Sequence, residues 1–223
     1  MRSLVFDSSS VISLATNDLL GTLKGLKKLF GGGFCIPAAV ARELVDVPLS
    51  SHRFKLEAMM VSKLIEGGEL EVHSSLEVGN LLASVNRIFS CRGASIVVVN
   101  KGEVEALALA VKIGAAAYVV DERTMRLLDE DPLRVRRILE GKLHAKVIVD
   151  KTLLKSFQDF VRGLKIIRSA ELMMVAFEEG LLKEVVMSGA SRRDTVDALL
   201  WGLRLRGCSI STGEIEELKR LME

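Results

Sequence analysis

The sequence predicts one α/β domain over residues 1–223, built on a mostly parallel sheet that is covered by helices. Short apolar runs, such as those at residues 4–6 and 116–120, are typical of buried parallel strands. Amphipathic helical patterns lie between these runs. Nearly half of the residues are apolar but only 4% are aromatic, so aliphatic side chains must fill the core. These observations favour a parallel sheet between helices.

The first predicted strand, residues 4–6, ends at one carboxylate, Asp7. The following cluster, Ser8, Ser9 and Ser10, is interpreted as a turn and as the N-cap of a helix. Ligands bind at the carboxyl edge of open α/β sheets, which is where Asp7 would lie. The alternative is that Asp7 is a turn residue that satisfies nearby backbone amides.

The remaining elements follow from periodicity and from breakers such as Gly and Pro. Further strands are predicted at residues 34–37, 70–73, 116–120 and 164–167, and residues 95–99 form either a strand or a loop. Helices are predicted at 19–29, 38–46, 52–65, 76–89, 102–111, 124–128, 170–179, 191–206 and 212–222. Residues 130–163 are amphipathic and basic.

The composition narrows the class of protein. The net charge of +2 neither requires nor excludes a nucleic-acid partner. Three widely spaced cysteines without a CxxC pair make a zinc site unexpected and favour a reduced, intracellular protein. Asp7 interrupts any signal-peptide core, and no apolar stretch reaches the roughly 18 residues that span a bilayer. We therefore expect a cytoplasmic protein.

Four acidic residues recur at equivalent places. Asp7 and Asp121 end buried strands, whereas Glu43 and Glu103 lie in helices that follow short strands or loops. Such positions converge on one edge of a parallel α/β sheet, and clustered carboxylates repel one another unless a cation is present. Mg²⁺ prefers these ligands, and it can activate water and polarise a phosphoryl oxygen.

Each acid also has a simpler interpretation. Glu43 could simply be an exposed residue of a helix. Glu103 and Glu105 could simply be acids that favour the first turn of a helix because of the helix dipole. Glu105 lies two positions from Glu103 and therefore points to a different helix face. Glu122 is either a supporting group or a solvated one.

Four segments, taken in order, resemble the PIN-domain ribonucleases. They are residues 5–9 (VFDSS), 37–43 (PAAVARE), 102–110 (GEVEALALA) and 119–123 (VVDER). The C-terminal third, with residues 166–167 and a last helix pair at 198–222, resembles a prokaryotic branch of that family. The resemblance implies a three-layer α/β/α fold in which residues 52–96 and 130–163 are extra helical insertions and residues 164–223 complete the domain.

The resemblance also implies a function. Members of this family are expected to be endoribonucleases that cleave single-stranded RNA with the help of Mg²⁺ or Mn²⁺. They are often homodimers and often the toxin of a toxin–antitoxin pair. The carboxylates carried over are Asp7, Glu43, Glu103 and Asp121, with Asp7, Glu103 and Asp121 holding the metal. Ser8, Ser9, Glu105 and Glu122 are expected in supporting positions. Ser9 is equally compatible with a plain N-cap.

Two questions stay open from the sequence. Arg134, Arg137 and Lys142 either line a path for RNA phosphates or form a solvated face. Val119 stands two positions before Asp121, where many family members carry Thr or Ser, which leaves room for a different class of function. That alternative is a catalytically inactive PIN-like scaffold that binds RNA or a protein. A phosphatase or a flap-type DNA nuclease is a third possibility.

Overall fold

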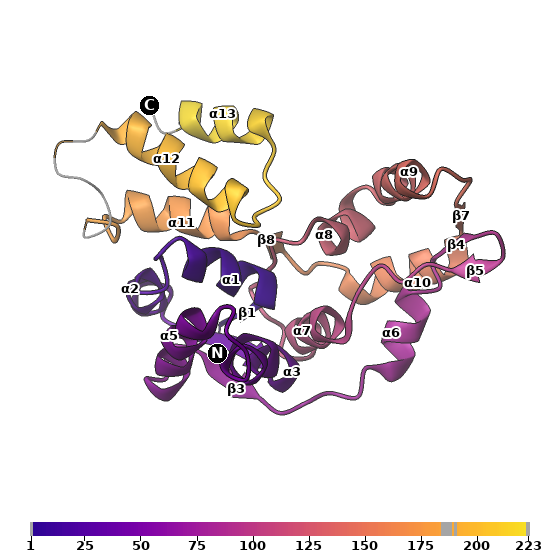
Figure 1. Ribbon diagram of the computed structural model, residues 1–223, viewed down its shortest axis with the longest axis horizontal. Coiled ribbons are helices and arrows are strands. Elements are labelled where there is room, and N and C mark those ends of the chain that lie inside the picture. The colour runs from indigo at the N-terminus through magenta and orange to yellow at the C-terminus, as the bar shows by residue number, and fades with distance from the viewer. Residues whose placement is uncertain (1, 184–188, 190, 222–223) are drawn as a thin grey trace.

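The protein is built around a five-stranded parallel sheet with the strand order β3-β2-β1-β6-β8 (Figure 1). The computed structural model describes residues 2–183, 189 and 191–221. The strands of this sheet are β1 (Ser3–Phe6), β2 (Gly33–Pro37), β3 (Glu71–His73), β6 (Ala117–Val119) and β8 (Ile166–Ile167). All five coincide with predicted strands, and the predicted α/β fold class is confirmed.

The central strand β1 sets the position of the carboxyl edge. Leu4 and Phe6 pair with Ala117 and Val119 of β6, and Val5 also faces Cys35 of β2. Val5 and Phe6 are fully buried. The ends of β1 and β6 therefore lie side by side, and the residues that follow them emerge at the same edge of the sheet.

Helices cover both faces of this sheet. Helix α7 (Lys101–Lys112) packs against β1, β2 and β6, while α1 (Ser8–Thr16) packs with α5 (Lys55–Glu66) and α11 (Ser169–Glu178). Helix α12 (Arg192–Leu205) contacts α11 and α13 (Thr212–Leu221), beyond the sheet. The remaining helices of this part of the chain are α2 (Thr22–Phe30), α3 (Ala38–Ala41), α4 (Val47–Leu49) and α8 (Arg123–Glu130). Met222, the last residue of the predicted final helix, lies outside the described residues.

Parts of the two predicted insertions pack together as one projecting arm, on the right of Figure 1. A small antiparallel sheet, β5-β4-β7, joins β4 (Phe89–Cys91) and β5 (Ala94–Ser95) to β7 (Ile148–Val149). Helix α6 (Gly79–Val85) contacts α10 (Lys151–Val161), and α9 (Pro132–Leu143) contacts α8. The predicted helix at 76–89 is therefore too long, because its last residue, Phe89, begins a strand.

The helical segment after β2 also differs from the prediction. The sequence predicts one helix over residues 38–46, but α3 is followed by a π-helical turn, η1 (Arg42–Asp46), and then by α4. A π-helical turn holds more residues than an α-helical turn, and it rotates the side chains that it carries. Such turns often occur at functional sites. In the described part of the chain, no helix is long and apolar enough to cross a membrane.

Candidate carboxylate site

Asp7 follows β1 directly and is itself the N-cap of α1, in place of the predicted serines. Its Oδ2 accepts hydrogen bonds from the Ser9 backbone N–H at 2.9 Å and from the Ser9 hydroxyl at 2.5 Å. Its Oδ1 is buried without a hydrogen-bond partner among the described residues. An unpartnered buried carboxylate oxygen is costly, so Oδ1 is a position where a cation would be stabilising.

Ser9 connects the ends of the two central strands. Besides donating to Asp7, its Oγ accepts hydrogen bonds from the backbone N–H groups of Asp121 at 3.1 Å and Glu122 at 3.3 Å. The neighbouring Ser10 hydroxyl donates to the carbonyl oxygens of Asp7 and Val119, at 2.8 Å and 3.0 Å. Ser9 and Ser10 therefore hold Asp7 in place.

Glu43 reaches the same edge from the π-helical turn. Its carboxylate rests against the first turn of α7, so closely that a methyl group on Gly102 would lie 2.5 Å from Oε1. The N-terminal end of a helix stabilises negative charge. The absence of a side chain at Gly102 therefore allows Glu43 to lie at this helix end.

Glu103 is fixed by a capping box at the start of α7. Its Oε2 accepts a hydrogen bond from the Asn100 backbone N–H at 2.7 Å, and its own N–H donates to Asn100 Oδ1 at 2.9 Å. The buried Tyr118 hydroxyl donates to the Glu103 carbonyl at 3.3 Å. This arrangement combines good helix capping with burial, since the Glu103 residue is only 9% exposed.

Asp7, Glu43, Glu103 and Glu122 form one electrostatic group, which we call the carboxylate cluster. Burial, together with the charges of the other three carboxylates, raises the pKa of Glu103 to about 7, although the hydrogen bond from Asn100 opposes the shift. Burial likewise raises the pKa of Asp7 to about 6, although the hydrogen bonds from Ser9 oppose the shift. The cluster therefore holds protons near neutral pH when no cation is present.

Asp121, predicted as a metal ligand, follows β6 and lines one cavity together with Glu122. Its Oδ1 accepts a hydrogen bond from the Ser169 backbone N–H at 2.7 Å, and its Oδ2 accepts one from the Ser169 hydroxyl at 2.6 Å. Its carbonyl oxygen accepts a third from the Ser209 N–H at 3.1 Å. Burial raises the pKa of Asp121. These bonds tie α11 and the segment before α13 to the end of β6.

The charge of Glu122, predicted as a supporting residue, contributes to the raised pKa of Glu103. Glu122 is also the N-cap of α8, where its carboxylate accepts from the N–H groups of Thr124 and Met125. Glu105 differs from the cluster, because its Oε1 accepts from the Leu76 N–H at 3.2 Å and its Oε2 is buried without a partner among the described residues.

The cluster is chemically suited to a hard divalent cation. All of the side-chain atoms that could coordinate a metal in the cluster are carboxylate oxygens, which Mg²⁺ and Mn²⁺ prefer as ligands. Among the described residues, no three of these carboxylates have oxygens that all lie within 4.8 Å of one another. Mg²⁺ commonly binds one or two protein carboxylates and keeps several waters, so this wider spacing fits a hydrated ion.

The predicted RNA-contacting side chains lie on the projecting arm. Arg134, Arg137 and Lys142 are exposed on α9. Arg137 lies 3.6 Å from the Asp131 carboxylate. Elsewhere, a polar cavity of about 430 Å³ is lined in part by Asp121 and Glu122 and by two cationic side chains, Arg123 and Arg204.

A family model described as a PIN domain matches residues 3–139, a range that contains all four carboxylates of the cluster. No curated protein and no solved structure matches the chain.

Proposed function

Because the chain belongs to the PIN-domain family, whose members are generally nucleases, we propose that it is a metal-dependent endoribonuclease that hydrolyses phosphodiester bonds of single-stranded RNA. The observation that carries this proposal is the carboxylate cluster at the carboxyl edge of the sheet. Burial and mutual repulsion raise the pKa values of Asp7 and Glu103, and Asp7 Oδ1 lacks a partner in the described part of the chain. A divalent cation would relieve both conditions.

In this proposal Asp7 and Glu103 hold Mg²⁺ or Mn²⁺, and Glu43 and Glu122 complete the site. A bound divalent ion supplies polarisation of the phosphoryl oxygen and a water of lowered pKa. The chain's own residues provide orientation. Ser9 fixes one Asp7 oxygen, and the capping box fixes one Glu103 oxygen. Glu122 replaces Asp121 in the set of catalytic carboxylates, since Ser169 already binds both Asp121 oxygens.

The surface near the cluster supports a polyanionic substrate. Arg123 and Arg204 line the cavity that also contains Glu122, so cationic groups flank the carboxylates. We propose that they bind phosphates next to the scissile bond, while Arg134 and Arg137 on the arm bind phosphates further along the strand. Contacts of this kind make affinity fall as salt concentration rises.

We also propose that the chain forms a cytoplasmic homodimer and that residues 1–223 are a single domain. Exposed apolar side chains line one groove together with Glu43, among them Ile12, Val47 and Phe54, which are 39%, 58% and 40% exposed. Clustered exposed apolar residues are typical of protein interfaces. The same surface suits an antitoxin as well as a second copy, and light scattering of the purified chain distinguishes a dimer from a monomer.

The test is cleavage of mixed-sequence RNA oligonucleotides with Mn²⁺, Mg²⁺ or EDTA. We expect metal-dependent cleavage by the wild type, none by Asp7→Asn, and wild-type activity from Glu178→Gln, which changes an exposed acid outside the cluster. Single-stranded and branched DNA substrates test the choice of nucleic acid. A folded wild type without cleavage under any metal contradicts the proposal and favours an inactive scaffold.

A further inference from the structure

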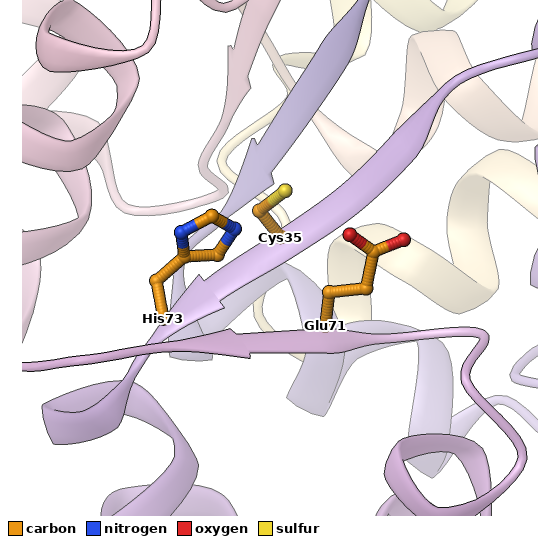
Figure 2. Close-up of side chains that lie close together, drawn as sticks. All are labelled: Cys35, Glu71 and His73. Atoms are coloured by element: carbon orange, nitrogen blue, oxygen red, sulfur yellow. The ribbon is translucent and has the colours of Figure 1, made fainter. Parts of the chain in front are cut away.

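A second group of potential metal ligands lies between β2 and the edge strand β3. In the parallel pairing of these strands, Cys35 is opposite Glu71 and Pro37 is opposite His73. Residues two apart on a strand point to the same face, so Glu71 and His73 share the face on which Cys35 lies. Figure 2 shows the three side chains converging there. One ligand atom from each lies within 4.8 Å of the others.

The chemistry of these ligands differs from that of the carboxylate cluster. Thiolate and imidazole ligands together select zinc, whereas Mg²⁺ and Mn²⁺ prefer oxygen ligands. Three protein ligands of this kind leave one tetrahedral position for water or another molecule. We propose that Cys35, Glu71 and His73 bind one Zn²⁺ ion that links β3 to β2.

The surroundings of the three side chains are arranged as a metal site requires. Lys27 Nζ donates to Glu71 Oε1 at 2.6 Å and to the Gly68 carbonyl at 2.7 Å, which orients the carboxylate. Hydrogen bonds of this outer kind commonly fix metal-binding carboxylates. Gly33 lies beneath the site, and a methyl group there would be 3.4 Å from Glu71 Oε2 and 3.5 Å from Cys35 Sγ. These two ligand atoms therefore flank a space that no Gly33 side chain fills.

Binding requires a modest contraction. With zinc bonds of about 2.0–2.3 Å, tetrahedral ligand atoms are separated by roughly 3.5 Å, less than the 4.8 Å limit within which these atoms lie. Cys35 is buried in the sheet and stays in place, whereas Glu71 is exposed and His73 is half-buried. The two residues of β3 therefore have the freedom to close on the thiol.

The ion would stabilise a strand that has little else to hold it. β3 is three residues long, and its middle residue, Val72, is 44% exposed. Short edge strands with exposed side chains contribute little apolar burial. Because β2 leads directly into α3 and the π-helical turn, a zinc link at β2 and β3 would also steady the segment that carries Glu43.

The test uses Co²⁺ as a spectroscopic substitute for zinc. The full chain is stripped with a chelator, titrated with Co²⁺ and then with Zn²⁺, and its absorption is recorded. We expect a thiolate-to-cobalt charge-transfer band that saturates at one ion per chain and disappears when Zn²⁺ displaces Co²⁺. The carboxylate cluster contains no thiol, so ions bound there do not produce this band, and failure of the nuclease proposal leaves this result unaffected.

The variants localise the site. Cys35→Ser is expected to abolish the band, and His73→Gln to weaken Co²⁺ binding at least tenfold. Cys91→Ser, a matched change on the projecting arm, should keep both the band and the affinity. Absence of the band in the wild type, or a band that survives in folded Cys35→Ser, overturns the proposal. If Cys35→Ser does not fold, wild-type affinity in His73→Gln overturns it instead.

Discussion

The substitution Asp7→Asn tests how much the buried charge of Asp7 destabilises the metal-free fold, separately from its proposed role as a metal ligand. Burial raises the pKa of Asp7 from 3.8 to about 6 in a side chain that is 1% exposed. One pKa unit corresponds to about 1.4 kcal/mol, so keeping Asp7 ionised costs the metal-free fold on the order of 3 kcal/mol. Asn is a good N-cap and can still accept the hydrogen bond from the Ser9 amide.

Proton linkage determines whether this contribution to stability rises or falls with pH. A carboxyl group whose pKa is raised on folding contributes stability below its unfolded pKa, and this stability is lost as the pH rises through the folded pKa. For Asp7 that window runs from about pH 4 to about pH 6, and for Glu103 it extends to about pH 7. Metal-free wild type should therefore lose stability between pH 4 and pH 7. Asp7→Asn removes the part of this loss that comes from Asp7, and it lowers the pKa of Glu103 because a neighbouring charge is gone.

The assay is urea denaturation in EDTA at pH 4 and pH 8. We expect Asp7→Asn to exceed the wild type in free energy of unfolding by about 2–3 kcal/mol at pH 8, and to show no such gain at pH 4. Glu178→Gln should match the wild type at both values. The same difference between Asp7→Asn and wild type at both pH values would refute the reasoning, because a buried, repelled carboxylate must make that difference depend on pH.

Three further substitutions test separate parts of the site. Ser9→Ala removes an outer hydrogen bond to a proposed ligand and should weaken Mn²⁺ binding about tenfold, measured by calorimetry; unchanged affinity would contradict this role. Gly102→Ala should displace the Glu43 carboxylate and slow RNA cleavage in a chain that melts no lower than wild type, whereas unaltered cleavage would show that Glu43 is dispensable. Ser169→Ala should cost about 2 kcal/mol in urea denaturation, since it removes a bond to the buried Asp121, yet preserve metal-dependent cleavage; loss of cleavage in the folded variant would return Asp121 to the site.

The central sheet could be predicted from sequence because its strands are short apolar runs between helical patterns. Val5 and Phe6 are buried, as are Val119 and Val120 at the other central strand. The antiparallel sheet of the arm could not be predicted. Phe89 and Val149 pair across a long sequence separation, and each strand is too short to show a period.

Part of the candidate site was also predictable from the order of strands and helices. Strand ends and helix starts converge on one edge, so Asp7, Glu43 and Glu103 were foreseeable as neighbours. The proposed preference for Glu122 over Asp121 was not predictable, because it depends on hydrogen bonds to Asp121 from Ser169, which is distant in sequence. The sequence signal for Glu122 was its acidic side chain close to the end of a predicted strand.

The potential zinc ligands show the same limit. Cys35 and His73 belong to no sequence motif, and the spacing of the cysteines gave no reason to expect zinc. The parallel register of β2 and β3 alone brings them to one face. Pairings of this kind depend on tertiary structure, which local sequence patterns do not contain.

The most direct test of the central claim is Mn²⁺ binding to the carboxylate cluster, measured by calorimetry at pH 7.5. Wild type and Cys35→Ser should bind Mn²⁺ alike, since the claim places the ion on carboxylates. Glu103→Gln should weaken binding at least tenfold, because it removes a proposed ligand whose pKa is raised to about 7 by burial and by three neighbouring acids. Wild-type Mn²⁺ affinity in a folded Glu103→Gln variant would contradict the account.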